Sequence, residues 1–177
     1  MSKIISIATG LPAYRYKQEE LFSFADEVYS KEPTDSRKLK FLYDHSGIAE
    51  RYSVIPDFNI PAGERTFFPP SRDLEPFPSI ESRMASFNKD AADLSVQTIT
   101  DCIKGKINKD EITHLITVSC TGMSAPGLDL QIMEMMELPQ HIVRTSVNFM
   151  GCYAAVQVLK LADAFCNGSK HANVIVV

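Results

Sequence analysis

Residues 141–167, HIVRTSVNFMGCYAAVQVLKLADAFCN, hold the pattern that decides the fold. The first part is a β-rich run that stops at Gly151, and its apolar members are Ile142, Val143 and Val147. From Cys152 onward, apolar residues recur at helical spacing over most of the helix circumference, which is typical of a buried central helix. Gly168 stands where a left-handed C-cap belongs. The stretch therefore predicts a strand, a turn that carries Cys152, and a buried helix.

The predicted position of Cys152 favours chemistry. Unpaired backbone N–H groups and the dipole at a helix N-terminus stabilise negative charge, and a thiol placed there is stabilised as the nucleophilic thiolate. The small Gly151 beside it lets a substrate approach the sulfur. A buried, inert packing cysteine is the alternative that the local pattern leaves open.

Composition limits the class of protein. The chain has 177 residues, 45% apolar and 23% charged, with a net charge of −4, which is typical of one soluble globular domain over residues 1–177. The charge does not favour nucleic acid or an anionic membrane as a partner, and no run is long enough to span a bilayer. The four cysteines form no C-x-x-C pair and the four histidines do not cluster beside them. We therefore expect no metal site, no disulfide framework and a cytoplasmic location.

Alternating patterns predict an α/β fold with a mainly parallel sheet. The expected strands are Lys3–Ala8, Ile48–Ile55, His114–Ser119, the run before Gly151, and Asn173–Val177. The expected helices are Lys17–Tyr29, a second one that follows the break at Pro33 and is capped by Asp35 or Ser36, Ser79–Lys104, Leu128–Met136 and the helix after Cys152. Residues 56–78 hold six prolines and are expected to form an ordered surface excursion.

Four segments resemble one enzyme family. NFMGCYAA around Cys152 resembles the nucleophile segment of the type III polyketide synthases, the chalcone synthase-like enzymes of the thiolase superfamily. THLITVSCTGMSAPGLDLQ (113–131), SGIAERY (46–52) and PSIESRMASFNKDAADLS (78–95) resemble further stretches of the same family. Ketoacyl synthases usually carry Ala before the nucleophile and a small residue after it, so Gly151 and Tyr153 favour the polyketide branch.

The resemblance implies an architecture. The thiolase fold is a five-layer αβαβα sandwich of two similar halves, and residues 1–177 correspond to the N-terminal half. The C-terminal thiolase-like domain, which holds the family's catalytic His and Asn, is then absent from this chain. The 177 residues alone are expected to be inactive in polyketide synthesis and to self-associate through the apolar helix after Cys152.

The resemblance also implies site residues and substrates. Cys152 is the nucleophile that takes an acyl group from acyl-CoA and is extended with malonyl-CoA, with no cofactor besides these CoA thioesters. Cys120 and Thr121 fall on the pair that lines the substrate cavity, in a loop that crosses the interface of a homodimer. Lys38 falls on one of the cationic positions that hold CoA phosphates, whereas Phe41 and His45 depart from the other two. A solvated helix face is the alternative for Lys38.

Two other hypotheses stay open. The chain could be the corresponding half of a ketoacyl synthase that acts on acyl carrier protein, or a short non-catalytic relative that works by pairing with a partner. A test of whether the protein is loaded from acyl-CoA or from acyl carrier protein distinguishes the ketoacyl synthase hypothesis from the polyketide synthase one. The coding sequence that follows Val177 distinguishes the non-catalytic hypothesis.

Overall fold

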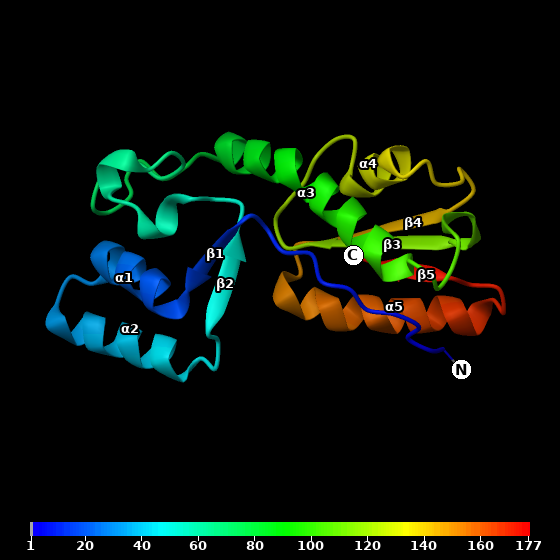
Figure 1. The fold of residues 1–177 in the computed structure, drawn as a ribbon, viewed down its shortest axis with the longest axis horizontal. Helices are drawn as coiled ribbons and strands as arrows, with labels where there is room; N and C mark the ends of the chain where they lie inside the picture. The colour runs from blue at the N-terminus through cyan, green and yellow to red at the C-terminus, as the bar shows by residue number, and fades with distance from the viewer. Residues whose placement is uncertain (1) are drawn as a thin grey trace. The chain divides into compact units, whose positions relative to one another are not determined.

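The computed structural model describes residues 2–177 and divides the chain into two compact units. Unit 1 comprises the residues up to Gly10 together with Met84–Val177, and unit 2 is Leu11–Arg83. Each unit has its own sheet and its own helices (Figure 1). No helix among residues 2–177 is both long and apolar enough to cross a membrane.

Unit 1 is built on a three-stranded parallel sheet in the order β4-β3-β5. The strands are β3 (His114–Ser119), β4 (Val143–Asn148) and β5 (Val174–Val176), and His114 pairs with Val143 on one side and Val174 on the other. This confirms the prediction of a parallel sheet from these three runs. Because all three strands point the same way, their carboxyl ends meet at one edge of the sheet.

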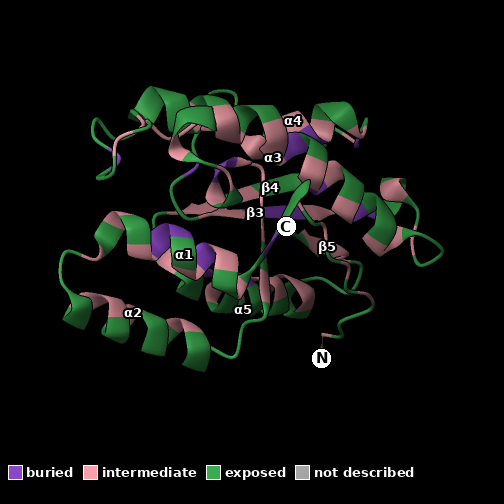
Figure 2. Cartoon of the chain, turned by 60° about the vertical axis from the view of Figure 1, so that its left-hand side comes forward, coloured by how far each residue is buried: buried purple, intermediate pink, exposed green. Residues whose placement is uncertain are grey.

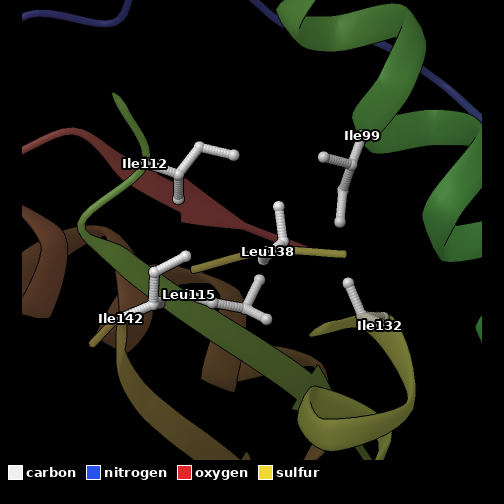
Figure 3. Close-up of a cluster of buried hydrophobic side chains, with 6 residues drawn as sticks. All are labelled: Ile99, Ile112, Leu115, Ile132, Leu138 and Ile142. Carbon is white, nitrogen blue, oxygen red and sulfur yellow. The ribbon is translucent and has the colours of Figure 1, made fainter. Parts of the chain in front are cut away.

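Helices cover both faces of this sheet. α5 (Ala154–Gly168) packs on one face, while α4 (Leu128–Met135) and the long α3 (Ile80–Ile103) lie on the other (Figure 1). Between α3, α4 and the sheet lies an aliphatic core, which Figure 3 shows in close-up. Its buried members are Ile99, Ile112, Leu115, Ile132, Leu138 and Ile142. Each buried aliphatic side chain stabilises the fold by roughly 1.5–3 kcal/mol relative to an exposed one.

Unit 2 combines a two-stranded sheet with a helical hairpin. β1 (Tyr14–Lys17) pairs antiparallel with β2 (Glu50–Ser53), and α1 (Gln18–Tyr29) packs against α2 (Pro33–His45). α1 buries Leu21, Phe24 and Ala25, whereas α2 buries no residue (Figure 2). Two short 3₁₀ turns follow, η1 (Asp57–Asn59) and η2 (Ala62–Glu64), inside the proline-rich segment.

Asp57 holds the proline-rich segment in place. Its fully buried carboxylate accepts hydrogen bonds from the backbone N–H groups of Thr66, Phe67 and Phe68 at 2.7–3.0 Å, and from the Thr66 hydroxyl at 3.0 Å. Burial raises the pKa of this carboxyl, but the hydrogen bonds from Thr66, Phe68 and Phe67 outweigh it, so the pKa is lowered. The segment is therefore ordered around a buried anion.

The prediction of a strand over Lys3–Ala8 is wrong. The segment forms no strand, and Ile4, Ile5 and Ile7 are 62–78% exposed. A run of β-branched residues is stabilised as a strand only when its backbone pairs and one face packs, and this segment has neither. The close contact with α3 comes two residues after the segment, at Gly10, where an added Cβ would lie 1.9 Å from Thr98 Oγ1. The strand that the sequence did not predict is β1.

Helix boundaries differ from the predicted ones most clearly in α2 and α5. α2 begins at Pro33, with Glu32 as its N-cap, because proline is tolerated in the first turn where its missing N–H is not needed. α5 begins at Ala154, after a 3₁₀ turn, and includes Gly168 instead of using it as a left-handed cap. α3 runs from Ile80 to Ile103, within the expected Ser79–Lys104, and buries Ala92, Ser95 and Ile99.

α5 is also less buried than its composition predicts. Only Ala154 and Val158 are buried, while Val156 and Leu159 are 49% and 55% exposed. The sheet covers one side of the helix, and Val156 and Leu159 on the remaining surface are exposed. An apolar helix of this kind presents its outer face for a further packing layer.

Candidate functional site

Cys152 lies on a tight turn between a strand and a helix. β4 ends at Asn148, the 3₁₀ turn η4 (Gly151–Tyr153) follows, and α5 starts at Ala154. The side chain of Cys152 is exposed and the cysteine is not in a disulfide. The structure thus places the thiol at the carboxyl end of a parallel strand and one turn before a helix, the position in which α/β proteins commonly hold reactive groups.

Two left-handed residues shape this turn. Gly151 has φ = 67°, and Phe149 has φ = 60° although it is not a glycine. A side chain in this region of φ/ψ space costs about 1–2 kcal/mol, so the backbone at Phe149 must be held by its surroundings. A Cβ at Gly151 would meet no atom within 4 Å, so glycine is required there by the φ angle, and the space beside Cys152 is open.

A backbone hydrogen bond ties the turn to the loop after β3. The N–H of Phe149 donates to the carbonyl of Cys120 at 3.0 Å. Cys120 and Thr121 follow Ser119, the last residue of β3, and both side chains are exposed. The loop predicted to line the substrate cavity and the turn that carries Cys152 are thereby brought together at one edge of the sheet.

Helix α5 starts without a side-chain cap, and the N–H of its first residue, Ala154, donates to carbonyls of the preceding turn η4. Its N-cap residue, Tyr153, makes no capping hydrogen bond with its side chain and instead receives a hydrogen bond from Gln157 one turn later. The first backbone N–H groups of a helix point outward from this end and carry partial positive charge. Cys152 lies one turn before this helix end, which is the kind of position where proteins commonly bind anions.

A cavity of about 200 Å³ opens at the same edge of the sheet. Its polar wall comes from facing strand positions: the register pairs Thr117 with Ser146 and Ser119 with Asn148. Thr117 and Ser146 share a hydrogen bond between their hydroxyls at 3.0 Å, and Ser119 Oγ accepts from the N–H of Gly122 at 2.8 Å. The remaining lining residues are Phe87, Gly122, Met123, Ser124, Gly127 and Leu128. Cys120, Thr121 and Cys152 lie at the same edge of the sheet as this cavity, but they are not among its lining residues.

Sequence reasoning missed this cavity. Thr117 and Ser119 alternate on β3, and Ser146 and Asn148 alternate on β4, so each strand carries a polar stripe that was visible in the sequence. What the sequence did not supply was the register that sets the two stripes side by side.

The structure places Lys38 in a different unit from the other predicted site residues. It is exposed on α2, in unit 2, whereas Cys152, Cys120 and Thr121 all belong to unit 1. Its neighbour Lys40 pairs with Asp44 at 3.0 Å, and Phe41 stacks on His45. On the α2 surface, the cation Lys40 is therefore already paired. Two of the three positions at which the family carries cations are occupied by the stacked Phe41 and His45.

Two of the four histidines, His114 and His45, have other partners. His114 stacks on Phe165 and its Nδ1 lies 2.8 Å from the Thr113 hydroxyl, and His45 Nδ1 lies 2.9 Å from the Phe41 carbonyl. No hydrogen bond or ion pair found among residues 2–177 joins a histidine to Cys152. Within the same range, no group of three or more His, Cys, Asp or Glu side chains is arranged to hold a metal ion.

Comparisons with known proteins point in one direction. Residues 1–177 match the family described as chalcone and stilbene synthases, N-terminal domain. The chain is 25% identical over 177 residues to "Probable polyketide synthase 1" of Dictyostelium discoideum, covering 99% of this chain and 5% of that protein. Among solved structures, PKS-I from the brown alga Ectocarpus siliculosus is 30% identical with a TM-score of 0.76, covering 92% of this chain and 43% of that one.

Two solved structures with lower sequence identity are similar to this chain in fold. The C-terminal type III polyketide synthase domain of Steely1, a type I/III hybrid from Dictyostelium, is 24% identical with a TM-score of 0.82, covering 98% of this chain and 46% of that chain. The fungal type III polyketide synthase ORAS is 18% identical with a TM-score of 0.75, over 98% and 44% of the two chains. The chain thus has the predicted α/β, thiolase-like fold and spans less than half the length of the solved chains that it matches.

Proposed function

Because the chain belongs to the chalcone and stilbene synthase family, as its N-terminal domain, we propose that it supplies the nucleophile of a type III polyketide synthase. The observation that supports this proposal is the position of Cys152, exposed on a turn between β4 and α5 and tied by Phe149 to the loop at Cys120. The substrates proposed for the whole protein are an acyl-CoA starter and malonyl-CoA.

The first proposed step is transfer of the acyl group. The Cys152 thiolate attacks the thioester carbonyl of acyl-CoA, a new C–S bond forms to Cys152, and CoA leaves as its thiolate and takes up a proton. The attack takes place next to the N-terminus of α5, where no side chain caps the helix. The open space beside Gly151 gives the acyl carbonyl access to the sulfur.

The second proposed step extends the chain by two carbons. Malonyl-CoA loses carbon dioxide to give an enolate, the enolate carbon attacks the Cys152 thioester, and the Cys152 thiolate leaves. The enolate oxygen needs hydrogen-bond donors, and removing one such donor typically costs about 10²–10³ in rate. By resemblance, the family's His and Asn in its second half supply these donors, so we expect residues 1–177 alone to be acylated slowly and not to extend the chain.

Cys120, Thr121 and Lys38 have proposed roles in binding. Cys120 and Thr121 border the site from the loop after β3, and their exposed side chains would contact the acyl group. Lys38 would pair with a CoA phosphate. Lys38→Gln should raise the KM for acyl-CoA without changing the KM for the matching N-acetylcysteamine thioester, which has no phosphate; equal effects on both thioesters would contradict the role.

Self-association is proposed from the outer face of α5. Val156 and Leu159 on this helix and Tyr153 just before it are about half exposed, and monomers rarely leave a large apolar patch uncovered. Pairing two copies through this face gives a homodimer with a two-fold axis. Sedimentation velocity at micromolar concentration should show a dimer that Leu159→Glu dissociates, and a stable wild-type monomer would contradict this.

The nucleophile assignment is tested by loading the protein with hexanoyl-CoA and measuring its mass. We expect one hexanoyl group, released by hydroxylamine and located on Cys152 by peptide mapping. Cys152→Ala should lose the label, whereas Cys120→Ala, which removes the other exposed cysteine, should keep it. Limiting iodoacetamide should likewise favour Cys152 over the other three thiols. Label that survives in Cys152→Ala, or equal alkylation of all four thiols, would overturn the assignment.

A further inference from the structure

Unit 2 contains a hollow of about 550 Å³ that the proposed reaction does not use. It lies among α1, α2, the β1–β2 sheet and the proline-rich segment, and we call it the aromatic pocket. Its buried lining includes Tyr16, Leu21, Phe24, Ala25 and Leu74, while Tyr29 and Leu42 at its edge are more than 60% exposed. Its volume lies within the range of small-molecule sites, about 300–1,000 Å³.

The floor of this pocket is a fixed cluster of rings. Phe58 contacts Tyr16, Phe24 and Phe68 edge to face, with ring centroids 5.1–5.6 Å apart. Aromatic pairs in this geometry add to the stability gained from burial alone. Such a floor presents ring faces and edges in defined directions, which suits a flat aromatic ligand better than a flexible chain.

Buried polar contacts hold the rings in position. Asp57, the neighbour of Phe58, accepts the N–H of Phe68 at 2.7 Å, and the Tyr16 hydroxyl donates to the carbonyl of Ile55 at 2.9 Å. Two rings from the proline-rich segment are thereby fixed against two rings from β1 and α1. A site that is already formed binds its ligand without the cost of ordering it.

One cation lines the aromatic pocket without a partner. Arg51 on β2 stands directly opposite Tyr16 on β1, so the two side chains share the face that lines the pocket. No hydrogen bond or ion pair of the Arg51 side chain is found among residues 2–177, whereas Arg15 pairs with Glu50 and Arg65 pairs with Glu27. A guanidinium without a partner binds a carboxylate through two parallel hydrogen bonds.

We propose that the aromatic pocket binds an aromatic carboxylic acid, with its ring system on the floor formed by Phe58 and its neighbours and its carboxylate on Arg51. This site lies entirely within unit 2 and does not depend on the activity proposed for Cys152. An aliphatic acid would satisfy Arg51 but not the ring floor, and a neutral aromatic compound would satisfy only the floor. The acid and the ring are therefore both part of the specificity.

The test uses 2-naphthoate as the probe, with 2-naphthalenemethanol as its neutral analogue and decanoate as its aliphatic analogue. The chain has no tryptophan, and three tyrosines besides Tyr16 line the pocket, so energy transfer from tyrosine to naphthalene reports binding. Calorimetry provides a second measurement. We expect saturable binding of one 2-naphthoate per chain, tighter than that of either analogue.

Variants separate the two parts of the recognition. Arg51→Gln should weaken 2-naphthoate about tenfold, the effect of losing one charge-assisted pair, and leave 2-naphthalenemethanol unchanged. Ala25→Leu, which adds volume to the buried lining, should weaken both. Arg37→Gln removes an exposed cation of α2 that does not line the pocket and should change neither. Circular dichroism confirms that each variant is folded.

Three results would overturn the proposal. The first is no saturable binding of 2-naphthoate to the wild-type chain. The second is equal affinity of Arg51→Gln and wild type for 2-naphthoate while Ala25→Leu also binds normally, which would place the probe elsewhere. The third is tighter binding of decanoate than of 2-naphthoate, which would make the pocket a site for aliphatic acids.

Discussion

The two units bury different kinds of side chain to reach an ordered core. Unit 1 packs six aliphatic residues between a parallel sheet and two helices (Figure 3). Unit 2 instead packs phenylalanine and tyrosine rings around a segment that is anchored by a buried carboxylate. The aliphatic core depends on filled volume and tolerates pH, since no charge takes part in it. The core of unit 2 depends on a charged group and on the geometry of its hydrogen bonds. The comparison predicts that the two units fail under different changes.

The largest effect is expected from a cavity in unit 1. Ile132 of α4 is fully buried in the aliphatic core, and Ile132→Ala should lower the free energy of unfolding by roughly 3–4 kcal/mol. Leu130→Ala on the same helix, at a side chain that is 42% exposed, is the matched control and should cost less than 1 kcal/mol by the same area argument. Urea unfolding followed by circular dichroism measures both. Similar losses for the two variants would mean that the core is not the main source of stability.

The second effect concerns the buried charge in unit 2. Asp57→Asn keeps the shape of the side chain but removes its charge and one acceptor, and should cost about 2 kcal/mol at pH 7. Hydrogen exchange of Thr66, Phe67 and Phe68 should speed up in this variant, while exchange in β3 should not change. Glu64→Gln, at an exposed carboxylate of the same segment, is the control and should leave both the stability and the exchange unchanged.

The stabilisation by Asp57 should also depend on pH, in a direction set by the lowered pKa of its carboxyl. Because the pKa of Asp57 is lowered in the folded protein, its stabilising contribution is complete above the ordinary pKa of 3.8 and is lost as the pH falls through the lowered folded value. The stability difference between wild type and Asp57→Asn should therefore shrink as the pH is lowered from 7 toward 2. Other carboxyls with lowered pKa, such as Glu20 and Glu50, contribute equally to the stability of both proteins. Their contributions therefore cancel in the difference between wild type and Asp57→Asn. A difference that stays constant with pH would contradict the role of the charge.

The smallest effect concerns a close approach in unit 1. A Cβ at Gly122 would lie 2.2–2.5 Å from atoms of the Phe87 ring, so Gly122→Ala forces this ring to move and should cost about 1–2 kcal/mol. Gly63→Ala in unit 2, where a Cβ meets nothing within 4 Å, is the control and should be neutral. Adding Phe87→Leu to Gly122→Ala should restore part of the loss measured by thermal unfolding. A double variant that is simply the sum of the two single losses would mean that the ring is not what Gly122 makes room for.

Much of unit 1 could be predicted from the sequence because its signals are local. Strand β3 and the turn at Cys152 follow from short apolar runs that stop at polar or glycine residues, and a parallel strand buried on both faces leaves that pattern. The prediction of a strand at Lys3–Ala8 was wrong because a short apolar run does not show whether a neighbouring strand is present to pair with it. The 200 Å³ cavity was missed because it depends on the register that sets Thr117 beside Ser146.

Unit 2 was predicted less well because its signals are not local. The proline content correctly excluded a regular element over residues 56–78, but the sequence does not show that Asp57 accepts N–H groups nine to eleven residues later. The start of α2 was misplaced because Pro33 was interpreted as a break, whereas it occupies the first turn of the helix. The alternation of Tyr14 and Tyr16 with charged residues is the signal that could have indicated β1.

The hydrogen bond from the N–H of Phe149 to the carbonyl of Cys120 uses only main-chain atoms. Any residue at position 120 can accept it, and any residue except proline that tolerates a left-handed backbone can donate it at position 149. The side chain at position 120 can therefore change in size or polarity without moving the turn that holds the thiol. For the function proposed above, selectivity for the acyl group and placement of the nucleophile are then separable in evolution, because the first depends on the side chain at position 120 and the second on this main-chain bond.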